Sequence, residues 1–81
     1  MERVLSMAAR RVSLVARDAY LAALPERRAR ASAVPAHFWV FEHATDPERF
    51  VEFTEAASSE LLAAALDPDP ASDVWREVQG G

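Results

Sequence analysis

Residues 37–56, with the sequence HFWVFEHATDPERFVEFTEA, decide the fold because two aromatic-rich, nearly alternating runs flank a short polar loop. Within that loop, Asp46 is followed by Pro47. An Asp at the first corner of a type I turn bonds its own backbone, and a Pro at the second corner fixes φ. The sequence therefore predicts a β-hairpin whose chain reverses between Ala44 and Glu48.

The first strand of this hairpin carries large apolar groups on both faces. Because side chains alternate along a strand, the two faces receive different sets: His37, Trp39, Phe41 and His43 on one, and Phe38, Val40 and Glu42 on the other. A half-solvated strand would be apolar on one face only. We therefore expect the chain's own helices to cover one face and a second subunit to cover the other, which predicts a homodimer.

Length and composition indicate one small domain spanning residues 1–81. A chain this short buries only about 60% of its unfolded surface, and it has no Cys for disulfides. Oligomerisation is the remaining way to enlarge the core. With two His and no Cys, a structural zinc site is not expected, and the sequence predicts no bound cofactor.

The charge pattern argues against several classes of partner. The net charge is -4, and Arg supplies every positive side chain, so a nucleic-acid-binding surface is not expected. Two small basic clusters, Arg10-Arg11 and Arg27-Arg28 with Arg30, are interpreted as solvated faces or surface ion pairs. Without a long apolar run or a recognisable leader, the chain is expected to be cytoplasmic, with no membrane partner.

Residues 3–12 fit two patterns. Helical spacing is met by Leu5, Ala8, Val12 and Val15, while strand alternation is met by Leu5, Met7 and Ala9. A hairpin alone is only marginally stable, and a stable sheet needs three or more strands. For this reason, and because the family resemblance given below implies a strand at this place, we assign residues 3–12 to a strand.

Two helices and a last strand complete the prediction. Asp18 is expected to cap a first helix, Pro25 predicts a kink or a restart in it, and Ala33-Val34-Pro35 ends it. Ser58 is expected to cap a second helix over residues 59–66, which the sequence Asp67-Pro68-Asp69-Pro70 ends. Residues 74–79 read as the last strand. The order βαββαβ predicts an α+β, ferredoxin-like fold with two helices on one face of a four-stranded antiparallel sheet.

One stretch of the chain combines a strand ending in Phe41-Glu42, the Asp46-Pro47 loop, the run Arg49 to Phe53 with Glu55, and a small helix from Glu60 to Leu66. In this order, these elements resemble the antibiotic-biosynthesis-monooxygenase-like family. The resemblance implies a dimeric α+β barrel, in which two ferredoxin-like subunits pack sheet against sheet and each can hold a pocket between sheet and helices. Members of that family include cofactor-free oxygenases of phenols and quinols and haem-degrading enzymes.

The chain departs from the catalytic members of that family. Haem-degrading relatives use an Asn, a Trp and a His together, whereas this chain has no Asn and its second helix has no His. The resemblance therefore supports the fold more than any particular reaction.

The candidate catalytic residues are His37, His43 and Glu42. Imidazoles transfer protons near neutral pH, and Trp39 and Phe41 between the two His can stack on a flat aromatic substrate. The structural alternative is that the two aromatic residues form an interface core and the His are solvated. Joint metal ligation by the two His is excluded because about 20 Å of strand separates them, at about 3.3 Å per residue.

Other candidates come from acidic and aromatic residues elsewhere. Glu42, Glu52 or Glu55 can act as a general base if burial raises its pKa, although strand carboxylates are more often exposed. Tyr20 and Trp75 are candidates for binding the substrate, with core positions as the alternative. Three functions remain open: a cofactor-free monooxygenase, a non-catalytic module for a small hydrophobic ligand, and a structural homodimer. A cavity between sheet and helices would distinguish them.

Overall fold

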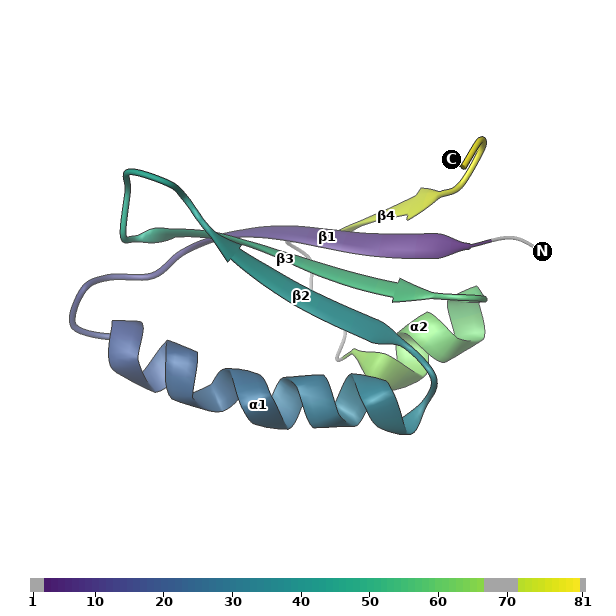
Figure 1. The fold of residues 1–81 in the computed structure, drawn as a ribbon, viewed down its shortest axis with the longest axis horizontal. Helices are drawn as coiled ribbons and strands as arrows, with labels where there is room; N and C mark the ends of the chain where they lie inside the picture. The colour runs from purple at the N-terminus through teal and green to yellow at the C-terminus, as the bar shows by residue number, and fades with distance from the viewer. Residues whose placement is uncertain (1–2, 67–71, 81) are drawn as a thin grey trace.

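Four strands and two helices alternate in the predicted order in the computed structural model, which describes residues 3–66 and 72–80. The elements are β1 (Val4–Arg11), α1 (Arg17–Ala33), β2 (His37–Glu42), β3 (Arg49–Ala56), α2 (Ser59–Ala65) and β4 (Ser72–Arg76). The strands form one antiparallel sheet in the order β2-β3-β1-β4, and both helices lie against the same face of it (Figure 1). The predicted ferredoxin-like fold is confirmed.

The β2–β3 hairpin turns where the sequence predicted. The backbone N–H of Arg49 donates to the carbonyl of Asp46 at 3.2 Å, and the N–H of Glu48 donates to the Asp46 side chain at 3.0 Å. Asp46 and Pro47 thus occupy the two corners for which their side chains are suited. The alternation had placed His43 on the same strand face as His37, Trp39 and Phe41. β2 instead ends at Glu42, so His43 belongs to the loop.

β1 is a strand, as the need for a third strand predicted. It pairs with β3 along its whole length and with β4 over Val4 to Ala8, so it is a central strand whose backbone groups are bonded on two sides. Tertiary pairing of this kind decides between helix and strand where the local pattern fits both. Leu5, Met7 and Ala9 share the face of the sheet that the helices leave open.

The first helix begins earlier than predicted and does not restart at Pro25. α1 begins at Arg17, with Ala16 as its N-cap and no side-chain capping bond, so Asp18 is a first-turn residue and not the cap. The helix continues through Pro25 as one element. Pro25 is exposed, and on that side of the helix water can bond the Leu21 carbonyl that the proline leaves without a donor.

The C-terminal elements follow the prediction with shifted ends. Ser58 caps α2 through its hydroxyl, which accepts from the N–H of Leu61 at 3.2 Å, and α2 ends at Ala65. The predicted Asp67–Pro70 stop lies outside the described residues. β4 lies earlier than the predicted range of 74–79 because its register places Arg76 opposite Val4, where β1 begins.

The side of the sheet under the helices has a core of small residues. The buried cluster consists of Val4, Ala31, Ala36, Ala56, Leu62 and Ala65. Polar side chains from the sheet are buried beside it, namely Ser6, Glu52 and Thr54. Small side chains bury little apolar surface per residue, so this core gives the folded chain only a modest hydrophobic stabilisation.

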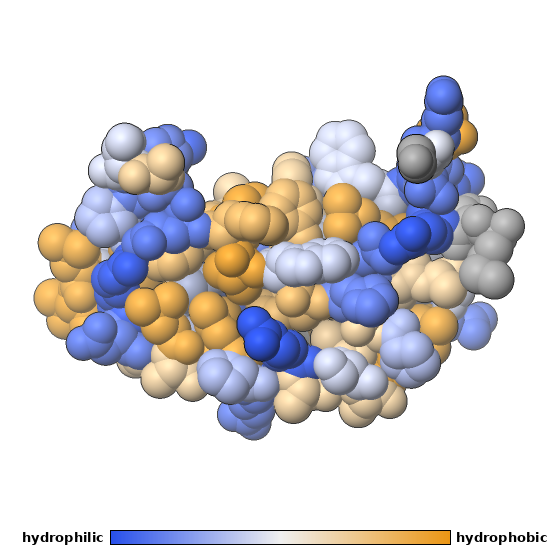
Figure 2. All heavy atoms as spheres, in the orientation of Figure 1, coloured by the Kyte–Doolittle hydropathy of each residue, from blue (hydrophilic) through white to orange (hydrophobic). Residues whose placement is uncertain are grey.

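The opposite face of the sheet, called here the open face, carries the larger apolar side chains. Trp39, Phe41 and Trp75 are 44%, 56% and 53% exposed, and the strand register places them around Met7, Val51 and Phe53. Figure 2 views this face from its edge, with apolar atoms between the hydrophilic β2–β3 loop and the C-terminal segment. An apolar surface of this composition usually marks an interface.

The N-cap of α2 provides a test of the local analysis. Ser58→Ala removes the hydroxyl that accepts from Leu61, so the free energy of unfolding should fall by about 0.5–2 kcal/mol. Ser59→Ala is the matched control, because Ser59 is exposed and lies one residue inside the helix. Urea denaturation at a fixed protein concentration measures both, and equal effects of the two substitutions would contradict the capping assignment.

Candidate functional site

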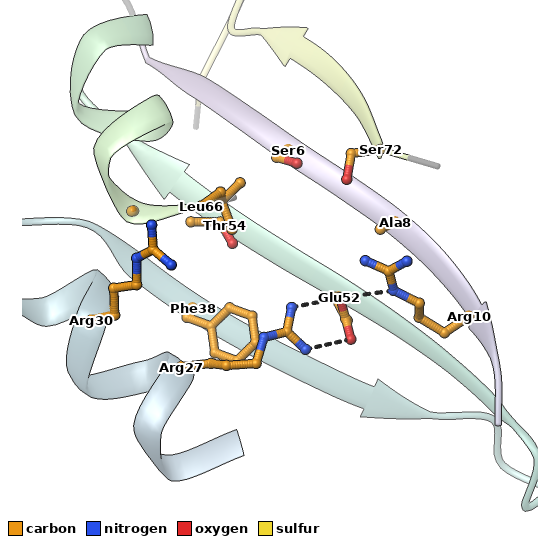
Figure 3. Close-up of a pocket in the computed structure, with 11 residues that line it drawn as sticks. Ser6, Ala8, Arg10, Arg27, Arg30, Phe38, Glu52, Thr54, Leu66 and Ser72 are labelled. Carbon is orange, nitrogen blue, oxygen red and sulfur yellow. Dashed lines mark hydrogen bonds and ion pairs between the residues drawn. The ribbon is translucent and has the colours of Figure 1, made fainter. Parts of the chain in front are cut away.

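A cavity of about 290 Å³ lies between the helix-covered face of the sheet and the two helices. Every strand contributes to it, together with α1 and the end of α2. Its lining residues are Ser6, Ala8, Arg10, Arg27, Arg30, Phe38, Glu52, Thr54, Ala65, Leu66 and Ser72 (Figure 3). This cavity is the candidate functional site, because it combines an apolar wall with converging polar groups.

The carboxylate of Glu52 lies at the centre of the polar wall and is 4% exposed. Arg27 binds it in a bidentate manner, with Nη1 2.8 Å from Oε2 and Nη2 2.8 Å from Oε1. The Arg10 Nε donates to Oε1 at 3.2 Å, and the Tyr20 hydroxyl donates to Oε2 at 2.5 Å. Four donors from two other elements therefore saturate both oxygens. We call Glu52, Arg27, Arg10 and Tyr20 the Glu52 cluster.

The electrostatics of the cluster keep Glu52 ionised. Burial by itself raises the pKa of a carboxylate, but hydrogen bonds from Arg27 and Tyr20 and the positive charges of Arg27 and Arg10 outweigh burial and lower the pKa of Glu52 to about 2. Burial raises the pKa of Tyr20, and the adjacent Glu52 raises it further. Hydrogen bonding to Glu52 raises the pKa of Arg27. Glu52 is thus a fixed anion and a poor proton acceptor near neutral pH.

Local periodicity places each member of the cluster. On β1, Arg10 shares the helix-covered face with Ser6 and Ala8, and the strand register sets Glu52 opposite Ala8. On α1, Tyr20 and Arg27 lie about two turns apart and so face the same side.

Ring contacts fix the positions of two cluster members. The Tyr20 ring packs on Phe50 at 4.7 Å between centroids, and the Arg27 guanidinium lies 4.9 Å from the centre of the Phe38 ring. These contacts tie α1 to β2 and β3 at the level of the cavity.

Most of the residues that the sequence suggested for substrate binding lie on the open face, on the other side of the sheet from the cavity. His37 stacks on Trp39 with 5.8 Å between ring centroids, and Phe41 makes an edge contact with Phe53 at 5.7 Å. Trp75 lies on β4 of the same face. These four predicted site residues therefore form one surface, which is separate from the cavity.

The other predicted residues are divided between loop, edge and cavity. His43 Nδ1 accepts the backbone N–H groups of Thr45 and Asp46 at 3.1 and 3.0 Å, so this His organises the β2–β3 loop. Glu42 forms an exposed ion pair with Arg17 of α1. Tyr20 is the predicted binding residue that reaches the cavity side, through its bond to Glu52.

The other two carboxylates that were considered as general bases, Glu52 and Glu55, lie on opposite faces of the sheet. Glu55 lies on the open face, opposite Leu5, and pairs with Arg3. Glu52 is buried as a base would need to be, but its arginine partners lower its pKa instead of raising it.

The arginines of the cavity are the functional residues that the sequence analysis misplaced. Arg11 and Arg28 are exposed, as expected of solvated basic clusters, but Arg10 and Arg27 bind the buried Glu52. The signal that identifies Arg10 is its alternation with Ser6 and Ala8. Arg10 and Arg11 were interpreted together as one solvated cluster, but adjacent residues on a strand face opposite sides, so Arg10 faces the helices while Arg11 is exposed.

Among the described residues, no three or more His, Asp or Glu side chains are arranged to hold a metal ion. In the same part of the chain, neither helix has the length and apolar character needed to cross a membrane.

Comparison with known proteins supports the fold. No family model and no curated protein matches the sequence. A solved structure described as a putative antibiotic biosynthesis monooxygenase from Nitrosomonas europaea superposes with a TM-score of 0.70 at 20% identity, over 78% of this chain and 62% of that chain. A conserved protein of unknown function from Bacteroides thetaiotaomicron, described as a possible oxidoreductase, gives 0.66 at 18% identity, over 94% and 93%. The resemblance to antibiotic-biosynthesis-monooxygenase-like proteins is thus confirmed at the level of the fold.

The Glu52 cluster predicts a specific loss of stability in acid. The pKa of Glu52 is lowered from 4.5 to about 2 by folding, so its contribution is present above about pH 4.5 and is lost as the pH falls toward 2. The loss over this window should be roughly 3 kcal/mol. Urea unfolding at several pH values in this range measures it.

Two variants identify the source of this acid sensitivity. Glu52→Gln should be less stable at neutral pH and should lose most of the slope, because no carboxylate remains to be protonated in the cluster. Glu42→Gln removes an exposed carboxylate paired with Arg17 and should retain the slope. A Glu52→Gln variant with the full wild-type slope would show that other groups cause the acid sensitivity.

Proposed function

We propose that this chain is the subunit of a homodimeric, cofactor-independent oxygenase that acts on a small phenol or quinol bound between sheet and helices. The observation that carries the proposal is the composition of the cavity. Arg10, Arg27 and Arg30 line it together with the ring of Phe38 and the side chain of Leu66. A flat ring can lie against the apolar wall while its oxygen atoms face hydroxyl and guanidinium donors.

The size and wall of the cavity favour a small aromatic compound. A volume of about 290 Å³ is at the lower end of the range of about 300–1,000 Å³ found for small-molecule pockets. Hydroxyl groups of Ser6, Thr54 and Ser72 provide further hydrogen-bonding partners along the sheet side. A substrate with few rings and several oxygen atoms matches this arrangement better than a purely apolar ligand.

The electrostatics favour the ionised form of such a substrate. Arg10, Arg27 and Arg30 bring guanidinium groups to the wall of the cavity, and a positive charge close to a bound phenol lowers its pKa. The anion can then give an electron to molecular oxygen. For an anthrone, the reacting CH2 carbon becomes a carbonyl, one oxygen atom is incorporated, and the other leaves as water.

The names of the superposed structures agree with this reaction class. One is described as a putative antibiotic biosynthesis monooxygenase and the other as a possible oxidoreductase. At 20% and 18% identity these likenesses establish a common fold, and for function they supply a reason to test oxygenation first.

A second candidate is a non-catalytic module that binds the same kind of ligand. It is favoured by the state of Glu52, whose oxygens are all occupied. It is also favoured by the absence of an imidazole among the described residues that line the cavity. A cavity without a general base can bind an acidic ligand and favour its ionised form. Turnover would then require a substrate whose anion reacts with oxygen without the help of a catalytic side chain.

The homodimer is proposed from the open face. Trp39, Phe41 and Trp75 are about half exposed in the protomer, whereas fully buried aromatic anchors dominate stable interfaces. A second copy packed sheet against sheet would cover them with the same surface in an isologous interface. Because the core under the helices is small and rich in Ala, burial of these aromatic side chains between two copies would add substantially to the stability of the fold.

The assembly can be tested by a charge placed on the open face. Wild-type protein at micromolar concentration should sediment at twice the 8.9 kDa of the chain. Phe41→Glu should shift the equilibrium toward monomer, because association would bury an unpaired carboxylate. Leu14→Glu is the matched control, since Leu14 is 61% exposed on the β1–α1 loop. A wild-type monomer that is folded and ideal would contradict the proposal.

The reaction can be tested by oxygen uptake with a panel of hydroquinones and anthrones. Ser72→Phe should fill the rim of the cavity from β4 and abolish most of the uptake. Val74→Phe changes an exposed residue on the same strand that does not line the cavity, so it should leave activity unchanged. Arg30→Gln should lower kcat/KM by about 10-fold or more, and Arg28→Gln, on the same helix, should not.

The predicted site on the open face gives the opposing result. His37→Ala and His43→Ala should retain activity if the chemistry takes place in the cavity. Loss of uptake in His37→Ala, with Ser72→Phe active, would transfer the site to the open face, whereas loss in His43→Ala alone would implicate the β2–β3 loop. Binding without oxygen uptake across the panel would favour the non-catalytic module.

A further inference from the structure

We infer that two copies of the chain pack their open faces in opposite orientations, so that Arg49 of β3 in one copy pairs with Asp73 of β4 in the other. This inference rests on the homodimer of the proposed function, because it names the charges that orient the two copies. It follows from where the strands place the charged side chains of the open face.

The open face carries two charged side chains that the protomer itself does not pair. The Arg, Asp and Glu side chains that the described strands place on this face are Arg11, Arg49, Glu55 and Asp73. Arg11 pairs with Glu48 at 3.3 Å, and Glu55 pairs with Arg3. The side chains of Arg49 and Asp73 are exposed and form no ion pair or hydrogen bond with any residue that the structure describes.

These two charges are too far apart to pair within one copy. Arg49 lies opposite Arg11 of β1, whereas Asp73 lies opposite Met7, so about 13 Å along the strands and about 10 Å across them separate the two Cα atoms. The β2–β3 loop, after which β3 begins, and β4 lie at opposite ends of the molecule (Figure 1). A second copy that covers the open face removes water from both charges, which is costly unless it also brings an opposite charge to each.

Two-fold symmetry satisfies both charges with one kind of contact. In an isologous interface, a contact from Arg49 of one copy to Asp73 of the other occurs twice. Packing with the two β2–β3 ends together would instead bring the Arg49 side chains of both copies close to each other, beside Arg11 of each copy. Juxtaposed like charges disfavour that orientation.

The shape of the open face agrees with the same orientation. A groove of about 280 Å³ lies at the β2–β3 end, with Phe41, Val51 and Arg49 among its lining residues. Trp75 follows Asp73 by two residues on β4, so the two side chains point to the same side about 7 Å apart, and Trp75 is 53% exposed. A copy that brings Asp73 to Arg49 therefore also brings Trp75 to the groove, and each copy supplies an aromatic side chain to the groove of the other.

Sedimentation velocity over a dilution series tests the inference by charge reversal. Arg49→Asp and Asp73→Arg should each weaken the dimer at least about 10-fold, because each variant places like charges together twice in the interface. The double variant restores both pairs with exchanged signs, so its dissociation constant should return to within about threefold of the wild-type value. Arg28→Asp and Glu26→Arg make the same charge changes at exposed positions of α1 and should leave the dissociation constant unchanged.

The outcomes separate this inference from the homodimer itself. A wild-type dimer that is insensitive to both single variants would overturn the inference and leave the homodimer in place. A double variant that associates no more tightly than either single variant would do the same. A wild-type monomer would overturn the inference and the homodimer together.

Cross-linking tests the orientation without charge reversal, in case a reversed charge prevents folding. The chain has no Cys, so Arg49→Cys and Asp73→Cys each introduce a single thiol. A short bismaleimide should join the two variants to each other after they are mixed, and it should not join Arg49→Cys to itself. Cross-linked Arg49→Cys homodimers without a mixed product would show the other orientation and overturn the inference.

Discussion

A carboxylate placed between a sheet and its covering helix must be compensated, and in this protein the compensation joins three elements of the chain. Glu52 of β3 is bound by Arg10 of β1 and by Tyr20 and Arg27 of α1. Removing any one donor would leave part of a buried charge unpaired, which costs more than a neutral hydrogen bond is worth. The position of α1 over the sheet, the ionised state of Glu52 and the polar wall of the cavity all depend on this cluster.

The same constraint explains how apolar side chains are distributed between the faces of the sheet. Charged and hydroxyl groups occupy much of the helix-covered side, and its apolar residues are mainly small. Space therefore remains there for a cavity, while the larger residues such as Trp39 and Phe53 lie on the open face. The chain therefore has exposed apolar side chains on the open face of the sheet and a polar cavity on the helix-covered face. The proposed assembly and the proposed ligand binding would thus use opposite sides of the sheet.

Residues 3–12 fitted both a helical and a strand pattern, and their assignment to a strand rested on the need for a third strand and on the family resemblance. Sequence patterns predicted the hairpin and the Ser58 cap, because each follows from alternation, turn chemistry or a side chain that bonds its own neighbours. They were wrong at the start of α1, where Ala16 and not Asp18 is the N-cap, and at β4, whose bounds depend on pairing with β1. Four of the predicted site residues, His37, Trp39, Phe41 and His43, came from one strand face, and Glu42, Tyr20 and Trp75 came from elsewhere. The structure instead divides them between open face, loop and cavity.

The sequence by itself determined which side chains share a strand face or a helix side, and hence the order of elements and the presence of two differently covered faces. Those are local properties, set by the period of each element and by the residues in its turns. Only the tertiary structure decided that Arg10 and Arg27 face a buried carboxylate instead of solvent. That outcome depends on the register of β1 against β3 and on where α1 docks, and both are fixed by contacts between residues far apart in the chain. The charge state of Glu52 follows from those contacts, since burial and arginine partners shift its pKa in opposite directions and the partners prevail.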